Sequence, residues 1–175
     1  MDFIEVINER QSIRAYKNQP VTPEKLQQIL EAINRAPSAG NLQAYEVYVV
    51  CDAKHKTALA KAAYDQEFLT QAPLILVFCA HAARSADKYG KRGINLYCVQ
   101  DATIACTFAM LAATALGLST VWVGAIDEDA IRRVISAPQD QRPVAMLPVG
   151  YPAESPRRKP RRMLKDLIHV VERVA

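Results

Sequence analysis

The stretch Ala36-Pro-Ser-Ala-Gly-Asn-Leu-Gln-Ala-Tyr-Glu-Val-Tyr-Val-Val50 predicts a corner at which a helix ends and a strand begins. Pro37 disfavours a helical conformation in the residue before it, and the second half, rich in Val and Tyr, favours a strand. Gly40 lets the backbone approach a neighbour closely. The polar side chains of the corner donate and accept hydrogen bonds: Ser38, Asn41 and Gln43. Such a corner can hold a flat ligand, although an ordinary polar loop explains the spacing equally well.

Length and composition set the scale of the fold. The chain has 175 residues, of which 50% are hydrophobic, which is enough for one domain with a sizeable core over residues 1–175. The formal net charge is +4, and much of the excess lies in the run 157–162. A local cluster argues against a broad nucleic-acid-binding face and favours a small anionic partner. A solvated tail is the alternative interpretation of this run.

The cysteines and histidines indicate no metal site. The four cysteines are widely spaced, contain no CxxC pair and lie in apolar surroundings, so we expect buried free thiols and a reducing compartment. The three histidines lack the spacing of metal ligands. The N-terminus has neither the basic start nor the apolar run of a signal peptide. These features together predict a cytoplasmic protein without a bound metal.

One apolar stretch has the length of a membrane span. Ala102–Ile126 contains no charged residue and is long enough to cross a bilayer. Gly117 and the Ser119-Thr120 pair nevertheless divide it into a helix end and a separate strand, so we expect no membrane insertion. The helix expected over Ile94–Leu116 is apolar nearly all round. That pattern predicts burial, either at the centre of the fold or against a second subunit.

The remaining pattern predicts an α+β fold. Helices are expected from residue 3 to about 10, from 23 to 33, 54–64, 94–116 and from 128 to about 135, and strands in the second half of the corner and at 74–79, 120–124 and 144–150. Residues 82–93 are expected to form a mobile, exposed excursion. A proline-rich arm then precedes a last apolar-patterned segment at 164–174. The expected architecture is a central sheet of about four to five strands with helices on both faces.

Phosphate binding in this chain must use side chains, because the sequence contains no GxGxxG or Walker-A pattern. In an extended segment, Arg10, Ser12 and Arg14 point the same way, so that two guanidinium groups flank a hydroxyl. Guanidinium forks match the geometry of phosphate oxygens. Lys159 and Arg161 are further candidates near the other end of the chain. For the first group, the alternative is an exposed basic turn that pairs with the neighbouring glutamate.

These motifs together resemble the nitroreductase-like family of FMN-dependent oxidoreductases, over nearly the whole chain. The resemblance rests on the following segments: Arg10-Gln11-Ser12-Ile13-Arg14, the loop Ala36–Gln43, Ala115-Leu116-Gly117-Leu118 leading to Trp122-Val123-Gly124, and Val149-Gly150-Tyr151-Pro152 followed by Lys159-Pro160-Arg161. It implies a mostly antiparallel sheet. It also implies an obligate homodimer with FMN sites at the subunit interface, in which the long central helix mediates dimerisation.

The resemblance further implies which residues contact FMN. Contacts to the phosphate and ribityl chain are implied for Arg10, Gln11, Ser12, Arg14, Lys159 and Arg161. The loop that the second subunit lays against the isoalloxazine ring corresponds to Pro37, Ser38, Ala39 and Asn41. The pyrimidine side of the ring corresponds to Asp65 and Gln66, and the backbone near flavin N5 corresponds to Val123 and Gly124.

The implied activity is transfer of a hydride from NADH or NADPH through flavin N5 to a small acceptor, such as a nitroaromatic, a quinone or free flavin. Donor and acceptor would use the same face of the ring in turn, which predicts ping-pong kinetics. Because the flavin carries the chemistry, no side chain is assigned as a catalytic acid or base. The alternatives are an FMN-binding carrier or sensor without turnover, a dedicated FMN dehydrogenase of one metabolite, and a basic adaptor without a cofactor.

The chain departs from the family pattern in three ways. Gln43 is followed by Ala44 and Tyr45, where many relatives have Pro and an aromatic residue, and Phe68 stands where some members place a Lys near the ring. The chain is also short for the family, which leaves little room for the inserted helices that form a substrate lid. The resemblance therefore supports a flavin site better than it supports any particular acceptor.

Overall fold

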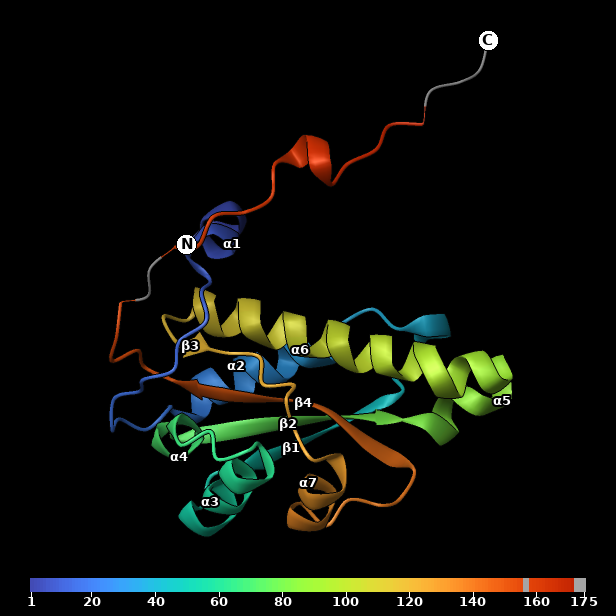
Figure 1. Ribbon diagram of the computed structural model, residues 1–175, viewed down its shortest axis with the longest axis horizontal. Coiled ribbons are helices and arrows are strands. Elements are labelled where there is room, and N and C mark those ends of the chain that lie inside the picture. Colours follow the sequence, from blue (N-terminus) through green and yellow to red (C-terminus); the bar gives the residue numbers. More distant parts are fainter. Residues whose placement is uncertain (156–157, 172–175) are drawn as a thin grey trace.

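The computed structural model describes residues 1–155 and 158–171, and its centre is a four-stranded antiparallel sheet (Figure 1). The sheet has the order β1-β2-β4-β3, with strands β1 (Tyr45–Val50), β2 (Leu74–His81), β3 (Ser119–Thr120) and β4 (Gln141–Gly150). β2 pairs with β1 on one side and with β4 on the other. The predicted α+β class with a mostly antiparallel sheet is confirmed.

Helices cover both faces of the sheet, as the sequence predicts (Figure 1). One face packs against α2 (Pro23–Asn34) and α6 (Cys98–Ala115), and the other packs against α3 (Ala53–Ala62), α4 (Phe68–Gln71) and α7 (Glu128–Val134). β2 is therefore buried on both sides. Its side chains alternate between the two cores: Leu76 and Phe78 face α2 and α6, whereas Ile75 and Val77 face α3 and α7.

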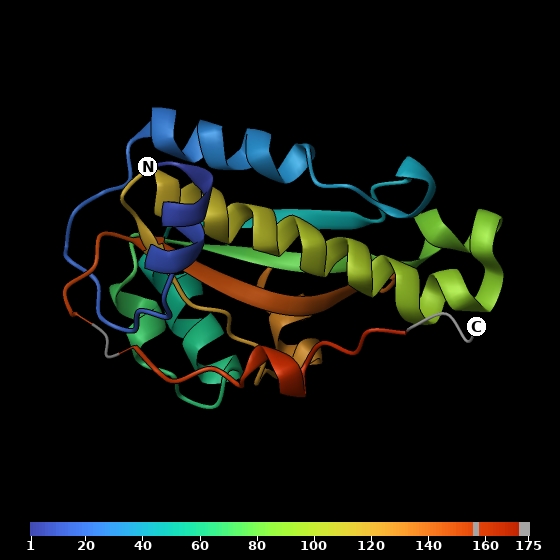
Figure 2. The same ribbon diagram turned by 90° about the horizontal axis from the view of Figure 1, so that it is seen from above.

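A helical stretch runs from Ala82 to Ala115 with a kink at Gly90. It consists of α5 (Ala82–Arg92), a π-helical segment (Gly93–Tyr97) and α6. The segment 82–93, expected to be a mobile, exposed excursion, is largely exposed as predicted, but it is helical: the backbone leaves helical angles only at Gly90, with φ 50°. Figure 2 shows α5 beyond the end of the sheet, at the far end of α6 from β3.

α6 ends where the sequence predicts. Gly117 has a φ of 73°, a left-handed conformation that favours glycine directly after a helix. The whole stretch Ala82–Ala115 is long and apolar enough to cross a bilayer, as the core helices of soluble proteins also can be. Here α6 packs on the sheet through small side chains, and Ala105 and Ala109 are fully buried.

β3 is shorter than the predicted strand 120–124. The pairing stops at Thr120 and resumes only as a single bridge between Val123 and Met146. Since Thr120 pairs with Val149, the same register sets Val121 opposite Pro148. Proline has no N–H to donate, so a ladder hydrogen bond is lost at this position. The cause of the interruption of β3 is therefore Pro148 on the partner strand β4.

The N-terminal helix is formed as predicted but is largely exposed. α1 (Phe3–Glu9) begins with a capping box, in which the Asp2 and Glu5 side chains each accept from the other residue's backbone N–H. Only Val6 of this helix is buried. Its other apolar side chains face outward: Phe3 is 66%, Ile4 62% and Ile7 46% exposed.

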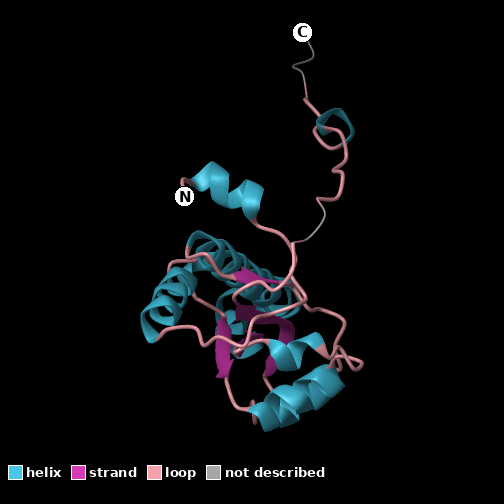
Figure 3. Ribbon diagram, turned by 90° about the vertical axis from the view of Figure 1, so that its left-hand side faces the viewer, coloured by secondary structure: helices cyan, strands magenta, loops and turns pink. Residues whose placement is uncertain are grey.

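The C-terminal arm leaves the body of the molecule (Figure 3). Its described residues from 158 onward are exposed and contain one short 3-10 turn, Leu164–Asp166. The apolar-patterned segment expected at 164–174 therefore packs on no part of the described chain, and Val170 is 81% exposed. Residues 172–174 of that segment and Arg157 of the basic run lie outside the described residues.

The segment between α1 and α2 is extended and hydrogen-bonded along the edge of the sheet. The Ile13 N–H donates to the Thr120 carbonyl at 3.1 Å, and the Lys17 N–H donates to the Tyr151 carbonyl at 2.9 Å. The buried Tyr16 hydroxyl donates to the Ile13 carbonyl at 2.7 Å. Burial raises the pKa of Tyr16 above its ordinary value, so this hydroxyl keeps its proton well into the alkaline range.

We predict that Tyr16→Phe lowers the free energy of unfolding by about 1–2 kcal/mol, because the buried Ile13 carbonyl loses its donor. Chemical denaturation at neutral pH measures the change. The raised pKa of Tyr16 also stabilises the fold fully below about pH 10, the ordinary tyrosine value, and this contribution declines as the pH rises further. The variant should therefore show a shallower alkaline decline. Tyr64→Phe is the control: Tyr64 is 69% exposed, and equal stability of the two variants would contradict the assignment.

Candidate functional site

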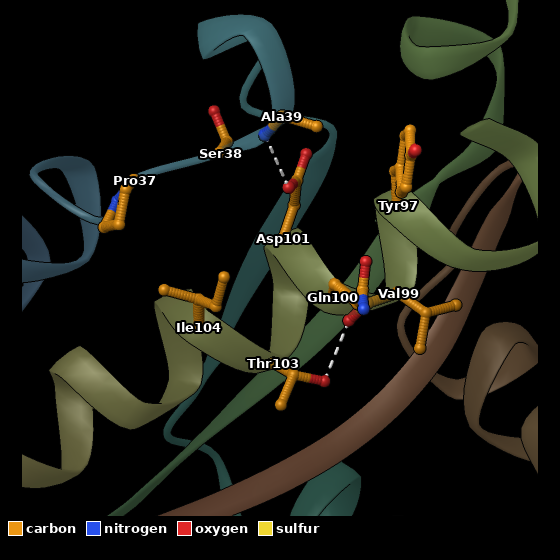
Figure 4. A pocket seen from close by; sticks show the side chains of 9 residues that line it. All are labelled: Pro37, Ser38, Ala39, Tyr97, Val99, Gln100, Asp101, Thr103 and Ile104. Atoms are coloured by element: carbon orange, nitrogen blue, oxygen red, sulfur yellow. Dashed lines mark hydrogen bonds between the residues drawn. The ribbon is translucent and has the colours of Figure 1, made fainter. Parts of the chain in front are cut away.

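A buried carboxylate of α6 holds the corner between α2 and β1. Asp101 is 2% exposed and accepts hydrogen bonds from the backbone N–H groups of Ala39 at 2.9 Å and Ala44 at 3.4 Å. The bond to Ala39 is drawn in Figure 4. Hydrogen bonds to an ionised carboxylate are stronger than neutral ones. Asp101 therefore ties both ends of the loop 39–44 to the helix.

Asp101 was missing from the predicted site residues, although the sequence carried a signal for it. It is the only charged residue between Ile94 and Ile126. An isolated charge inside an apolar helix must find a partner, because burying an unpaired charge is very costly. The partners are backbone N–H groups of a loop far away in the sequence, which the pattern of residue types does not reveal.

The loop has an uncommon backbone conformation. Gly40, Asn41 and Gln43 have positive φ angles of 57°, 57° and 49°, a region that disfavours residues with a side chain. At Gly40 an added Cβ would lie 2.5 Å from the Tyr89 hydroxyl oxygen. Glycine favours this angle, and because it has no side chain the ends of the Tyr89 and Lys88 side chains can lie against the loop backbone.

Two polar side chains of the corner, Ser38 and Gln43, form hydrogen bonds within the corner or to the helix end that precedes it. The Ser38 hydroxyl oxygen accepts from the Gln43 N–H at 2.9 Å. The Gln43 side chain donates to the Asn34 carbonyl at 3.3 Å, so it supports the loop and does not face a ligand. The Ser38 hydroxyl still has its own proton to donate, and Asn41 is exposed.

A cavity of about 510 Å³ opens between this loop and α6 (Figure 4). The loop side of its wall is formed by Pro37, Ser38 and Ala39, three of the predicted site residues. The helix side is formed by Tyr97, Val99, Gln100, Asp101, Thr103 and Ile104. Apolar side chains with a few polar groups at defined points are typical of a small-molecule site. The cavity suits a flat, mainly apolar ligand.

A second group of predicted site residues gathers beside β3. The bridge between Ser12 and Thr120 aligns the extended segment Arg10–Arg14 with this strand. Neither arginine forms an ion pair with another described residue. The alternative of a basic turn paired with Glu9 is wrong, since Glu9 pairs with Arg158 at 2.6 Å. Two guanidinium groups, with Gln11 and Ser12 between them, are thus available to an anion.

Gln66 and Gly124 lie close to each other at a neighbouring turn. The Gln66 amide donates to the Ala125 carbonyl at 3.3 Å, which sets it beside the Val123-Gly124 pair. Val123 is 2% exposed, and its N–H and C=O both bond to Met146 at 3.0 Å. Gly124 is exposed, and its N–H donates to no backbone carbonyl of the described chain. Gly124, rather than Val123, therefore offers backbone to a ligand.

Lys159 and Arg161 lie on the exposed arm. In the described part of the chain, neither has a hydrogen bond or ion pair to the Arg10–Arg14 segment. The arm meets this region through the ion pair between Arg158 and Glu9, which the sequence did not predict. One chain thus brings Arg10, Ser12 and Arg14 together but leaves Lys159 and Arg161 apart from them.

The two groups of site residues lie at opposite ends of α6. The loop that lines the cavity, called the cavity loop below, is hydrogen-bonded to Asp101 near the start of the helix. The Arg10–Arg14 segment is hydrogen-bonded to Thr120 just after the end of the helix (Figure 2). At about 1.5 Å per residue, Asp101 and Leu116 are roughly 22 Å apart along the helix axis. A single chain therefore does not assemble all predicted site residues in one place.

The buried thiols do not have the properties of nucleophiles. Burial raises the pKa of Cys79 to about 12, and burial also raises the pKa of Cys106, so both thiols stay protonated at neutral pH. Cys51 is exposed, which corrects the expectation that all cysteines are buried. Among the residues that the structure describes, no group of three or more His, Cys, Asp or Glu side chains could hold a metal ion.

Comparison with known sequences identifies the family. The sequence model of the nitroreductase family matches residues 7–67 and 61–151. The chain is 33% identical to the FMN reductase (NAD(P)H) of Bacillus subtilis, over 91% of this chain and 70% of that protein. It is 34% identical to a putative NADH dehydrogenase/NAD(P)H nitroreductase of Methanothermobacter thermautotrophicus, over 89% of this chain and 80% of that protein. The chain belongs to the nitroreductase family.

Comparison with solved structures agrees. The structure of the NADPH:FMN oxidoreductase from Vibrio harveyi complexed with NAD⁺ matches with a TM-score of 0.89 at 26% identity, over 97% of this chain and 77% of that chain. The fold expected from the resemblance is confirmed. The two structures share this fold over nearly the whole length of the present chain.

We predict that Asp101→Asn loosens the loop 39–44, because the neutral amide offers one acceptor oxygen where the carboxylate offers two. The Ala39 and Ala44 amides should exchange with deuterium about 10- to 100-fold faster than in the wild type, the effect of losing about 1.5–3 kcal/mol of charge-assisted hydrogen bonding. Hydrogen–deuterium exchange read by NMR measures the rates residue by residue.

Asp52→Asn is the matched control for this prediction. Asp52 caps α3 on the other face of the sheet and accepts from the His55 N–H at 3.0 Å. Its substitution should affect exchange in α3 and leave Ala39 and Ala44 unchanged. If both loop amides keep wild-type protection in Asp101→Asn, Asp101 does not hold the loop.

Proposed function

We propose that this chain is an FMN-dependent NAD(P)H oxidoreductase that folds as one domain over residues 1–175. The observation that carries the proposal is the extended Arg10–Arg14 segment, which bridges to Thr120 of β3 and whose guanidinium groups have no ion-pair partner in the described chain. Membership of the nitroreductase family supports it, as do relatives named FMN reductase and NAD(P)H nitroreductase.

The residues of the two groups fit FMN. A phosphate needs positive charge and hydrogen-bond donors, and Arg10, Ser12 and Arg14 supply both from one extended segment. An isoalloxazine ring needs a flat apolar wall with few polar groups at its edge, which the loop Pro37–Asn41 supplies. Gln66 and Gly124 offer an amide side chain and an open backbone N–H for the edge of the ring. The remaining proposed contacts of the phosphate and ribityl chain are Gln11, Lys159 and Arg161.

When bound, FMN supplies two-electron transfer, taking a hydride from NADH or NADPH at N5 and delivering electrons to the acceptor. The chain binds and orients the reactants. The Gly124 N–H and the nearby cations would stabilise negative charge at the ring. The loop Pro37–Asn41 would cover one face of the ring and keep water from it. No side chain of either group is assigned a proton-transfer role.

We propose that each complete site is shared between two copies of the chain. The cavity loop and the arginine segment are roughly 22 Å apart along α6 of one chain, so a twofold-related copy is needed to bring the loop of one subunit to the arginines of the other. The outer side of α6 suits such a contact. It carries no charge, and Ile104 and Phe108 are only partly buried there.

Exposed apolar side chains elsewhere support the same homodimer. On α1, Phe3 is 66% and Ile7 46% exposed. On the C-terminal arm, Leu164 is 76%, Val170 81% and Val171 95% exposed. Burial of apolar surface contributes about 25 cal/mol per Å², so each of these segments gains free energy by packing on a second copy. We propose that the arm packs on the partner subunit.

The other proposed partners are small molecules. NADH or NADPH is the proposed donor, and a nitroaromatic, a quinone or free flavin is the proposed acceptor. A nucleic acid or a membrane has no part in the proposal. We propose a cytoplasmic location, because a reducing compartment suits the free thiols of the chain.

After loading with FMN and desalting, the protein is expected to retain the visible absorption of oxidised flavin and to lose it on anaerobic addition of NADH or NADPH. Absorption spectroscopy measures both steps. Retention without bleaching would favour the carrier or sensor. Bleaching followed by reoxidation with one compound only would favour the dedicated dehydrogenase. Loss of all flavin on desalting would overturn the proposed function.

A mixing experiment tests whether sites are shared. Arg14→Ala should weaken FMN binding by about 1.5–3 kcal/mol through loss of a phosphate contact, and Ser38→Trp should block the wall that faces the ring. When the two variants are refolded together, each mixed dimer contains one site with neither substitution, so about a quarter of all sites should recover. Fluorescence titration with FMN counts them.

Sites confined to one chain would give no recovery in the mixture, because every site would then carry one of the two substitutions. Arg133→Ala is the control for loss of positive charge. Arg133 is exposed on α7, on the opposite face of the sheet from α6, and its removal should leave FMN affinity unchanged.

A further inference from the structure

An aromatic and cationic cluster lies at the tip of α5, outside both groups of predicted site residues. The Tyr89 and Tyr97 rings meet edge to face with their centroids 5.0 Å apart. Lys88 Nζ lies 5.4 Å from the Tyr89 centroid, and Arg92 Cζ lies 5.3 Å from the Tyr97 centroid. Arg92 Nε also donates to the Tyr97 hydroxyl at 2.8 Å. These contacts hold two cations against two rings.

The cluster borders the cavity between the loop and α6. Tyr97 belongs to the cavity wall, and its ring projects from the helix on the same side as the loop (Figure 4). A Cβ added at Gly40 would lie 2.5 Å from the Tyr89 hydroxyl oxygen and 2.6 Å from Lys88 Nζ, so both side chains rest on the loop backbone. The positive charge is therefore located at the edge of a cavity suited to a flat ligand.

The cations of the cluster are not neutralised by other described residues. The end of α5 carries Lys88, Lys91 and Arg92 together with one carboxylate, Asp87. None of these four side chains forms an ion pair in the described chain. Cations already ordered on aromatic rings lose less side-chain freedom when an anion binds. The cluster is thus a preorganised site for an anionic group.

We propose that this cluster binds the phosphate groups of the nicotinamide donor and makes NADPH the preferred donor over NADH. The inference rests on the proposed function, since it concerns the donor of the same site. The nicotinamide ring would stack on the face of the flavin that the loop Pro37–Asn41 leaves open, and the phosphates of the dinucleotide would then reach Lys88 and Arg92 at the edge of the cavity. NADPH carries one phosphate monoester more than NADH, with a charge of about −1.5 to −2. Lys88, Lys91 and Arg92 carry three positive charges and Asp87 carries one negative charge. The resulting net charge of about +2 balances the charge of this phosphate.

Donor preference is measured in the wild type and in the double variant Lys88→Gln/Arg92→Gln. The wild type should have a higher kcat/KM for NADPH than for NADH. The double variant should lose about 10- to 100-fold in kcat/KM for NADPH, the size of a lost charge-assisted phosphate contact. The loss with NADH should be only about threefold, because its diphosphate makes weaker, solvent-screened contacts.

Two further variants serve as matched controls. Lys88→Arg keeps the charge and should keep the preference for NADPH. Lys61→Gln removes an exposed lysine of α3, on the other face of the sheet, and should change neither donor. An equal loss with both donors in the double variant would contradict a role for the cluster in recognising the additional phosphate.

Direct binding separates this inference from the proposed function. Calorimetric titration with adenosine 2′,5′-bisphosphate needs neither turnover nor bound flavin. The wild type should bind it about tenfold more tightly than adenosine 5′-monophosphate, and the double variant should lose this difference. A wild type that prefers NADH, or a double variant that keeps the tighter binding, overturns the inference. Flavin retention with bleaching by NADH would leave the proposed function standing in that case.

Discussion

The hydrogen bonds between the Asp101 carboxylate and the loop 39–44 are the contact on which the candidate site depends. They satisfy a charge that α6 carries into the core, and they use backbone N–H groups instead of a cation to do so. The loop is therefore held at a set distance from the helix. One wall of the cavity, and the close contact of Gly40 with α5, follow from this attachment.

The length of α6 imposes the second constraint. The helix separates the cavity loop from the arginine segment, and both are attached to it or to the strand that follows it. Apolar side chains are exposed on α1 and on the C-terminal arm, and Ile104 and Phe108 of the same helix are only partly buried. A second copy of the chain would cover the apolar surface and would also complete the site.

The elements predicted from the sequence were those with strong local signals. The Thr22 cap and Pro23 mark the start of α2, Gly117 marks the end of α6, and the apolar run of β2 marks a strand covered on both faces. The errors arose where a distant residue decides. Pro148 of β4 interrupts β3. Residues 82–93, whose mixed composition predicted a mobile, exposed excursion, form the exposed helix α5, which contacts the loop and the π-helical segment.

By itself, the sequence determined the α+β class, a central sheet with helices on both faces, the arginine segment and the polar corner, because periodicity, caps and residue type act over short distances. The antiparallel order of the strands was implied only by the resemblance to the nitroreductase family. Only the tertiary structure decided that Glu9 pairs with Arg158 and not with the arginine segment, that Val123 is closed to ligands, that Asp101 holds the loop, and that one chain leaves the two groups apart. Those features depend on pairings between residues far apart in the chain, which local patterns do not specify.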